Sequence, residues 1–221
     1  MDLSERLPPE TEVILTINIP EDEFYLNSAV GLPLKIIRNS TPLGFGANHN
    51  QAFASSSGRR FLVVNPDVRI QGDPWRDLDK VFDLYSDAGA CAPSVLSPIG
   101  TIEDSVRHFP TIGKLLKRVI LGIRHSDYMA TDDSTPVVVD WVAGMFVMFD
   151  SMSFKTVGGF DTSYFMYLED VDICQRLSNI GKKIFWVPNC NVVHDAQRAS
   201  RRSWQHRRWH TRSMLRFLFR L

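Results

Sequence analysis

Runs of β-branched and aromatic residues alternate along the first half of the chain with segments of helical spacing. Apolar runs that end in turn residues predict strands at 12–19, 34–39, 61–68 and 90–96. Apolar residues at helical spacing predict a helix at 75–89 that ends at Gly89, and residues 44–58 are expected to form a loop leading into a helix.

The second half returns to strands after one long irregular segment. Residues 98–136 mix Gly, Pro, Thr and charges, which predicts a loop with one short helix near 113–123. Further on, the pattern predicts strand character at 137–149, a helix from the acids near 169 to Gly181, and two short strands within 182–194 broken by Pro188. Together the elements predict an α/β sandwich with a largely parallel sheet.

Length and charge limit the function classes. The chain has 221 residues, of which 44% are hydrophobic and 23% are charged, and this predicts one globular domain with a substantial core. We assign this domain to 1–197 and a basic amphipathic helix to 198–221. The formal net charge is zero, so the chain as a whole is not expected to bind nucleic acid.

The charge at the end of the chain is one-sided. The segment 198–220 carries eight arginines and no acid, at positions 198, 201, 202, 207, 208, 212, 216 and 220. A basic segment with aromatic residues could meet an anionic membrane surface at the periphery of a bilayer. It could equally be a solvated helix that closes the domain, and the sequence leaves both interpretations open.

Cysteine usage and hydropathy predict a cytoplasmic protein. The three cysteines, Cys91, Cys174 and Cys190, include no CxxC spacing, which argues against a disulfide framework or a zinc cluster. The first ten residues are polar, so no signal peptide is expected there. The most apolar stretch, 137–149, is too short to span a bilayer and is interrupted by Asp140.

A candidate ligand site follows the third predicted strand. The apolar run at 61–64 ends abruptly in Asn65-Pro66-Asp67. Ligands in open α/β sheets bind beyond the carboxyl ends of the strands, and Pro66 makes this turn stiff. Asp67 could therefore hold a metal or a substrate, although a plain turn explains the same three residues.

A second candidate site is the acidic group within "YFMYLEDVDIC". Carboxylates among apolar residues are costly to bury unless they are paired or bind something. The start of a helix accommodates one acid, and Asp172 can pair with Arg176 one turn further along. This leaves Glu169 and Asp170 as candidates for general-base catalysis.

Three further features are weaker signals by themselves. His194 ends a predicted strand and becomes a credible metal ligand only if Asp67 is close to it. The stretch "PLGFGANHN" could direct backbone N–H groups towards a phosphate. The stretch "VGGFD" at 157–161 predicts a sharp turn just before the acids.

Taken in order, these segments resemble the family 2 glycosyltransferases of the GT-A fold. The closest resemblance is to the rhamnosyltransferase-like and galactofuranosyltransferase-like branch. The matching segments, from about Gly44 to His194, are "GFGANHNQAF", "FLVVNPDV", "SVRHFP", "VDWVAGMFVMF", "VGGFDTSYFMYLEDVDICQRL" and "FWVPNCNVVH". The resemblance implies a Rossmann-like, three-layer α/β/α sandwich with a mixed, mostly parallel sheet.

The resemblance also implies roles for individual residues. Asp67 would bind Mn²⁺ or Mg²⁺ together with His194, and Asp170 would be the catalytic base, with Glu169 beside it shaping the acceptor pocket. The implied contacts to the donor or its diphosphate are Gly44, Asn48, Asn65, Asp67 and Arg107. The implied acceptor contacts are Trp141, Gly159, Phe160 and Asp161.

The implied activity is inverting sugar transfer. The donor would be a nucleotide sugar of the dTDP-rhamnose or UDP-sugar class, and the acceptor a hydroxyl of a glycan or a lipid-linked glycan. The implied setting is synthesis of cell-wall or surface polysaccharide at the inner face of the plasma membrane. The alternative is a non-catalytic GT-A-like domain that binds a glycan or a partner chain.

The chain departs from the family pattern at its front. The strand at 12–19 resembles the second strand of the family, and the first strand has no counterpart. A parallel sheet without one of its central strands leaves backbone groups and apolar faces uncovered. We therefore expect weakened nucleotide binding, a rearranged sheet edge, or a homo-oligomer that covers the gap.

Overall fold

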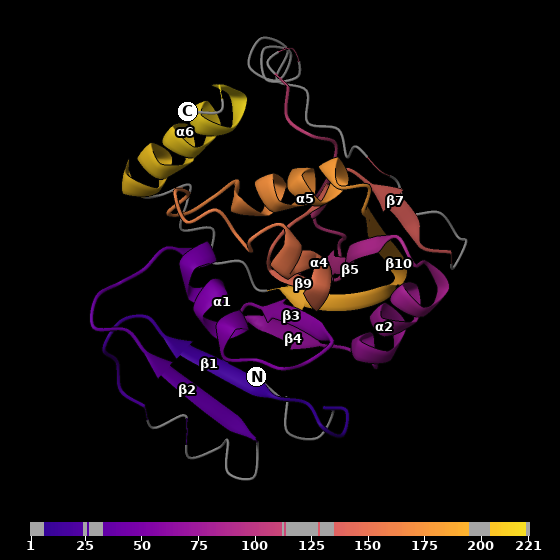
Figure 1. Ribbon diagram of the computed structural model, residues 1–221, viewed down its shortest axis with the longest axis horizontal. Coiled ribbons are helices and arrows are strands. Elements are labelled where there is room, and N and C mark those ends of the chain that lie inside the picture. Colours follow the sequence, from indigo (N-terminus) through magenta and orange to yellow (C-terminus); the bar gives the residue numbers. More distant parts are fainter. Residues whose placement is uncertain are drawn as a thin grey trace.

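The computed structural model forms an α/β/α arrangement with a smaller strand pair beside it (Figure 1). The structure describes residues 7–23, 26, 33–111, 113, 128, 135–194 and 204–219. The strands are β1 (Val13–Ile17), β2 (Leu34–Arg38), β3 (Arg60–Val64), β4 (Val68–Ile70), β5 (Ala88–Leu96), β6 (Val106–Arg107), β7 (Val137–Val139), β8 (Trp141–Val142), β9 (Phe146–Asp150) and β10 (Lys183–His194). The helices are α1 (Phe45–Ala54), α2 (Pro74–Leu84), α4 (Ser151–Thr156), α5 (Glu169–Asn179) and α6 (Trp204–Phe219).

The main sheet is mixed, as predicted. Its strand order is β3-β9-β5-β10-β4, with β7 also paired to β10. Strand β9 is antiparallel to both of its neighbours, and β10 is parallel to β5, so β3, β5 and β10 share one direction. Strands β4 and β7 pair with β10 in the antiparallel direction. The carboxyl ends of β3, β5 and β10 therefore lie at one edge of the sheet, where ligands of such sheets bind.

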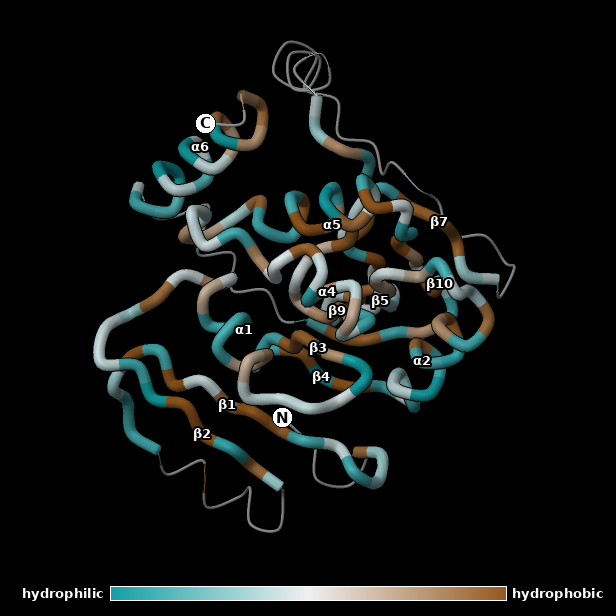
Figure 2. The backbone as a smooth tube through the Cα atoms, in the orientation of Figure 1, coloured by the Kyte–Doolittle hydropathy of each residue, from teal (hydrophilic) through white to brown (hydrophobic). Residues whose placement is uncertain are grey.

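Alternation of side chains along the strands builds two apolar layers, one on each face of the sheet. In β10, Ile184 and Trp186 belong to one buried cluster, whereas Phe185 and Val187 belong to the other. Helix α2 covers the second cluster, and α1, α4 and α5 cover the first. In Figure 2 much of the tube along the strands of the main sheet is brown, whereas the helices alternate between teal and brown. All three cysteines are buried and free.

Two predicted helices have local sequence signals at their ends. The Asp73 side chain accepts a hydrogen bond from the N–H of Arg76, and Pro74 occupies the first helical position of α2. Helix α5 ends at Asn179 and is followed by Gly181, whose φ is +80°, with the N–H of Lys182 donating to the carbonyl of Leu177. The end predicted for the first of these helices was wrong, because α2 stops at Leu84 and Gly89 lies within β5.

The prediction of two short strands at 182–194 was also wrong. Strand β10 is continuous from Lys183 to His194, and its pairing with β5 shifts register between Val187 and Asn191. Pro188 lies within this irregularity, where its missing N–H breaks no regular ladder bond. Its carbonyl accepts a hydrogen bond of 2.8 Å from Ser94 Oγ, which ties the bulge to β5.

The middle of the chain adds one helix that the hydrophobic pattern did not predict. Helix α4 begins where the Asp150 side chain accepts from both the N–H and the hydroxyl of Ser153. This is the N-cap signature of an acid at the end of a strand. The short helix predicted near 113–123 lies outside the described residues. Within the described residues, none of the helices has both the length and the apolarity needed to cross a membrane.

Strands β1 and β2 form a separate parallel pair at the front of the fold. Among the described residues, β1 has its ladder partner only in β2, and β3 has its ladder partner only in β9. Figure 1 shows the pair below the main sheet, beside α1. Side-chain amides hold it there, since Asn18 bonds to Leu43 and Asn39 bonds to both Asn18 and Asn48. A rearranged edge was one of the three outcomes expected, and the separate pair is such an edge among the described residues.

The separate pair should be the least protected strand region. In native-state hydrogen exchange, the β1 and β2 amides should exchange at least about tenfold faster than those of β5 and β10. The reason is that a two-stranded ribbon with few packed neighbours opens locally at a low cost in free energy. Equal protection in all four strands would contradict this expectation. Mass spectrometry of peptic peptides from 13–38 and 183–194 measures both regions in one experiment.

Candidate active site

The fold brings together Asp67 and His194, which are far apart in the sequence. The antiparallel register of β4 and β10 places His194 opposite Val68, the residue next to Asp67. As a result His194 Nε2 lies 3.2 Å from Asp67 Oδ2. The His194 side chain is only 10% exposed and that of Asp67 is 37% exposed, so the pair is open to ligands from the carboxylate side.

The pair has unused ligand capacity. Asp67 Oδ1 is buried and has no hydrogen-bond partner among the described residues. Glu103 Oε2 lies 3.7 Å from His194 Nδ1, on the far side of the imidazole from Asp67. No local pattern in the sequence pointed to Glu103, because only the tertiary structure brings it to His194.

The donor set suits a divalent cation that is shared with a substrate. A carboxylate and an imidazole are ligands that Mn²⁺ accepts, and a carboxylate also suits Mg²⁺. Within the described part of the chain no group of three or more His, Cys, Asp or Glu residues could hold a metal ion. The protein therefore offers two ligands here, and a bound diphosphate and water would complete the coordination.

The second feature of the site is the start of α5. Tyr167 and Leu168 adopt φ values of +72° and +68°, which non-glycine residues rarely adopt. Each such residue costs on the order of 1 kcal/mol and must be held by its surroundings. This tight turn begins α5 directly at Glu169 and Asp170 and fixes where their carboxylates lie.

Backbone donors distinguish the two carboxylates. Asp170 accepts hydrogen bonds from the N–H groups of Gly144 (3.1 Å) and Val171 (2.9 Å), which favour its charged form. Glu169 is 6% exposed, and its buried Oε2 has no partner among the described residues. Burial and then the charge of Asp170 raise the pKa of Glu169 to about 8, and burial also raises the pKa of Asp170.

Burial and mutual repulsion disfavour ionisation of both carboxyl groups at once. Two adjacent buried carboxylates cannot both ionise without a large cost in desolvation and repulsion. A single charge belongs on Asp170, since two N–H groups stabilise it there, and the proton belongs on Glu169. This assignment makes Asp170, rather than Glu169, the group able to accept a proton.

Arg107 and Trp141 form one wall beside the carboxylates. Strand β6 pairs with β8, so that Arg107 lies opposite Trp141, with its guanidinium 5.8 Å from the indole centroid. The Trp141 Nε1–H donates to the carbonyl of His108, and Arg107 pairs with Asp104 at 2.6 Å. The positive charge of Arg107 is also one of the influences that lower the pKa of Asp170 against the effect of burial.

Two adjacent residues connect the carboxylates with the Asp67 turn. The N–H of Gly144 donates to Asp170, and the carbonyl of Met145 accepts from the N–H of Asn65. An added Cβ at Gly144 would meet the Phe45 ring at 3.3 Å and Asp170 Cβ at 3.5 Å. The two halves of the candidate site thus share one short backbone segment, which the sequence did not reveal.

The glycine-rich stretch at 44–48 has structural contacts. A Cβ on Gly44 would lie 2.5 Å from the carbonyl oxygen of Phe165, so the close approach of α1 to this loop requires glycine. Asn48 accepts a hydrogen bond of 2.7 Å from Asn39, within the amide group that holds β1 and β2. The donor contacts implied for Gly44 and Asn48 remain predictions.

The turn at 158–161 is anchored in the core. The amide of Asn50 donates to the carbonyl of Phe160 and accepts from its N–H, and Phe160 is 2% exposed among other aromatic rings. Gly159 has φ of +70°, and Asp161 accepts from the N–H of Ser163. The acceptor contacts implied for this turn remain predictions, and the ring of Phe160 does not line an open surface.

The ion pair predicted within α5 is confirmed. Asp172 and Arg176 lie 2.7 Å apart, and Arg176 also donates to the carbonyls of Val157 and Gly159. Arg176 therefore joins α5 to the turn before it. Asp172 is engaged in this structural link and is not available for the chemistry of the carboxylate pair.

The fold is that of the GT-A glycosyltransferases. GalNAc-T7, solved with UDP, GalNAc and Mn²⁺, matches with a TM-score of 0.65 and 15% identity over 86% of this chain and 39% of its own. The mannosyltransferase PcManGT from Pyrobaculum calidifontis, solved with GDP-Man and Mn²⁺, matches with a TM-score of 0.58 and 15% identity over 93% and 55%. TarS from S. aureus matches with a TM-score of 0.59 and 14% identity over 84% and 31%. At these identities the similarity establishes the fold alone.

Sequence relatives identify the family. The rhamnosyltransferase WbbL of Escherichia coli is 32% identical over 186 residues, which are 80% of this chain and 70% of the relative. An N-acetylglucosaminyl-diphospho-decaprenol L-rhamnosyltransferase of Mycobacterium tuberculosis is 28% identical over 184 residues, 73% of this chain and 58% of the relative. No protein-family model matches the chain. The chain belongs to the rhamnosyltransferase-like family 2 glycosyltransferases, as the sequence motifs predicted.

Protonation of Glu169 predicts a specific pH dependence of stability. Because its pKa is about 8 in the folded protein and about 4.5 in an unfolded chain, the folded state binds more protons between these values. This group therefore makes the free energy of unfolding fall as pH rises, by up to about 1.4 kcal/mol per pH unit. Glu169→Gln, which mimics the protonated acid, should remove this contribution.

Urea unfolding of both proteins at several pH values tests this assignment. The stability of wild type should decline relative to Glu169→Gln between about pH 5 and about pH 8. Glu10→Gln, at an exposed acid, is the matched control and should run parallel to wild type. A constant difference between wild type and Glu169→Gln over this range would show that Glu169 is already ionised in the fold.

Proposed function

We propose that this protein transfers a sugar, with inversion, from a nucleoside-diphosphate donor to a hydroxyl group of a lipid-linked glycan. Membership in the family supports sugar transfer in polysaccharide synthesis. The observation that carries the finer proposal is the Asp170 carboxylate, which accepts from the N–H groups of Gly144 and Val171 and is joined through Gly144 and Met145 to the turn that holds Asp67.

Asp170 acts as the general base in this proposal. Its ionised carboxylate accepts the proton of the acceptor hydroxyl while that oxygen attacks the anomeric carbon. The bond from this carbon to the diphosphate oxygen breaks in the same displacement, and the electron pair leaves with the nucleoside diphosphate. A single displacement inverts the configuration at the anomeric carbon. Burial raises the pKa of Asp170, which makes its carboxylate a stronger base.

Asp67 and His194 hold the divalent cation in this proposal. A bound Mn²⁺ or Mg²⁺ would stabilise the negative charge that develops on the leaving diphosphate. The unpartnered Oδ1 of Asp67 and the adjacent His194 Nε2 support this role. Arg107, next to the carboxylates, contributes a fixed positive charge towards the same phosphates.

The relatives guide the choice of substrates. Both are rhamnosyltransferases, which favours dTDP-rhamnose over a UDP-sugar as the donor. The mycobacterial relative is described as acting on a decaprenol-linked N-acetylglucosaminyl diphosphate. We therefore propose a polyprenyl-diphosphate glycan as the acceptor.

Calorimetric titration with dTDP and with UDP, each with and without Mn²⁺, tests the donor site. Binding should require the metal, and Asp67→Ala should weaken it at least about tenfold, because a carboxylate ligand is lost. Asp83→Ala, an exposed acid on α2, removes one charge elsewhere and should bind as wild type does. Absence of binding to either nucleotide by the folded protein would instead support the non-catalytic alternative.

Replacement of the base tests the chemistry separately from binding. Asp170→Asn should lower kcat about 10²- to 10⁴-fold, because the amide cannot accept the proton, while its oxygen still accepts from Gly144. Metal-dependent nucleotide binding should stay within about twofold of wild type, since the donor ligands are unchanged. Asp172→Asn, two residues along the helix, should keep kcat within a few-fold. Loss of turnover in Asp172→Asn but not in Asp170→Asn would overturn the assignment.

A further inference from the structure

Helix α6 packs one side against the loop that precedes the catalytic carboxylates. The Ser213 hydroxyl donates to the carbonyl of Met166 at 2.9 Å, and the hydroxyl of Tyr167 lies 2.7 Å from His206 Nδ1. The ring of Trp209 lies 4.9 Å from that of Phe165. Ser213 and Phe217 are buried, so this side of α6 belongs to the fold.

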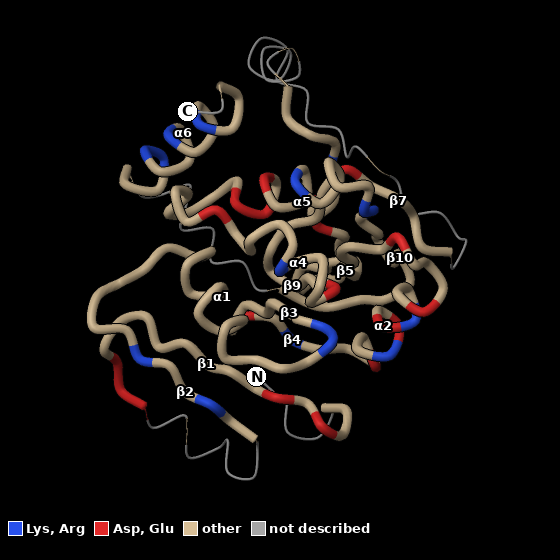
Figure 3. The backbone as a smooth tube through the Cα atoms, viewed as in Figure 1, with Lys and Arg blue, Asp and Glu red and all other residues tan. Residues whose placement is uncertain are grey.

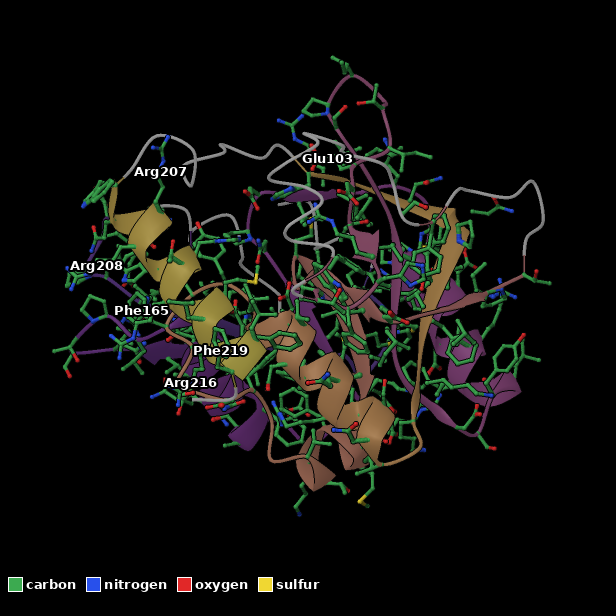
Figure 4. The ribbon with its side chains drawn as sticks, turned by 90° about the horizontal axis from the view of Figure 1, so that it is seen from above. Glu103, Phe165, Arg207, Arg208, Arg216 and Phe219 are labelled. Atoms are coloured by element: carbon green, nitrogen blue, oxygen red, sulfur yellow. The ribbon has the colours of Figure 1, made fainter. Side chains whose placement is uncertain are left out.

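The opposite side of α6 carries an apolar stripe bordered by arginines. Trp204, Leu215 and Phe219 are 81%, 48% and 57% exposed, and helical spacing places all three on one side. Arg208 lies within this stripe, between Trp204 and Leu215 along the helix axis, and is exposed. Arg207 and Arg212 are also exposed and lie at the sides of the stripe. Arg216 is half-buried and lies beyond Arg212 around the helix. Figure 4 shows Arg207 and Arg208 projecting from α6 away from the central sheet. We call this set of seven residues the outer face of α6.

The charge of the outer face is entirely positive. Helix α6 contains no acid, and Figure 3 shows it with blue segments and no red ones. Arg216 lies over the Tyr164 ring at 5.8 Å and influences Asp161, so its charge is directed partly towards the body of the protein. No ion pair is recorded for Arg208 or Arg212 with any acid of the described residues.

We infer that the outer face of α6 binds an anionic lipid surface. A helix in the plane of a membrane interface typically presents Trp, Leu and Phe to the acyl boundary, with arginines flanking them at the level of the headgroups. Basic residues next to an anionic leaflet each strengthen binding severalfold, and the outer face carries four arginines among its exposed apolar residues. A merely solvated helix gives no reason for three large apolar side chains to share one exposed stripe.

The contacts on the inner side connect lipid binding to the site. The loop at 164–168, on which α6 packs, leads without a break into Glu169 and Asp170. A surface bound to the outer face would therefore lie on the side of the molecule where this loop borders the carboxylates. If the proposed lipid-linked acceptor is correct, its polyprenyl chain and its glycan would meet the protein on that side. This position of the acceptor rests on the proposed function, whereas lipid binding itself does not.

Vesicle co-sedimentation of the whole chain tests the inference without any turnover. The protein should bind vesicles of phosphatidylcholine with about one third phosphatidylglycerol, and bind pure phosphatidylcholine far more weakly. Arg208→Gln with Arg212→Gln should reduce the partition coefficient about thirtyfold, since each arginine contributes about fivefold near such a surface. Higher salt should weaken the binding of wild type, because the attraction is partly electrostatic.

Matched variants separate lipid recognition from general charge. Arg76→Gln with Lys155→Gln removes two positive charges from exposed positions on α2 and α4 and should bind as wild type does. Trp204→Ala should weaken binding to the anionic vesicles while leaving the urea midpoint unchanged, since its side chain is exposed.

Two results would overturn the inference. One is equal binding to neutral and anionic vesicles. The other combines two observations. Wild type does not bind vesicles, and sedimentation velocity shows a concentration-dependent dimer of wild type that the Arg208/Arg212 variant does not form. The second result would assign the outer face to a protein partner. Metal-dependent binding of dTDP by the same variants reports on the donor site, so failure of lipid binding leaves the proposed function to its own tests.

Discussion

The cost of placing two adjacent carboxylates at a buried helix start governs the architecture around the candidate site. Glu169 and Asp170 follow a turn with two residues at positive φ, and only one of the two acids receives backbone hydrogen bonds. Neighbouring elements supply the hydrogen bond and the charge that offset this cost. Gly144 brings its amide to Asp170, and Arg107 supplies a positive charge from β6.

The contact between Asp67 and His194 depends on strand register rather than on helix geometry. Asp67 and His194 meet because β4 turns back along the end of β10. The stiff turn at Asn65–Asp67 is tied to Met145, the residue after Gly144. The two halves of the site are therefore both hydrogen-bonded to the short segment between β8 and β9.

The front and the end of the chain differ in how they join this core. Strands β1 and β2 are held mainly by side-chain amides and α1, and they share no ladder with the main sheet among the described residues. Helix α6 is held by contacts to the loop before α5. It therefore lies close to Glu169 and Asp170 despite its distance from them along the sequence. The outer face of α6 and the carboxylates are thus two sides of one packed unit.

The sequence alone determined the α/β class, most of the strands and helices, the family, and the candidate residues Asp67, Asp170 and His194. These follow from hydrophobic periodicity and from motifs that are local along the chain. Local signals also contained the cap of α4, although the hydrophobic pattern did not predict that helix. Local signals predicted the wrong end for α2 and split β10 into two strands, because burial in a sheet overrides the turn preference of Gly89 and Pro188.

Only the tertiary structure decided which of these residues work together. The contact of Gly144 with Asp170, the approach of Glu103 to His194, and the separation of β1 from β3 all join or divide residues far apart in sequence. The protonation of Glu169 belongs to the same group, since it requires burial and a charged neighbour. Such properties depend on distances across the fold and on the exclusion of water, which no local pattern of residues encodes.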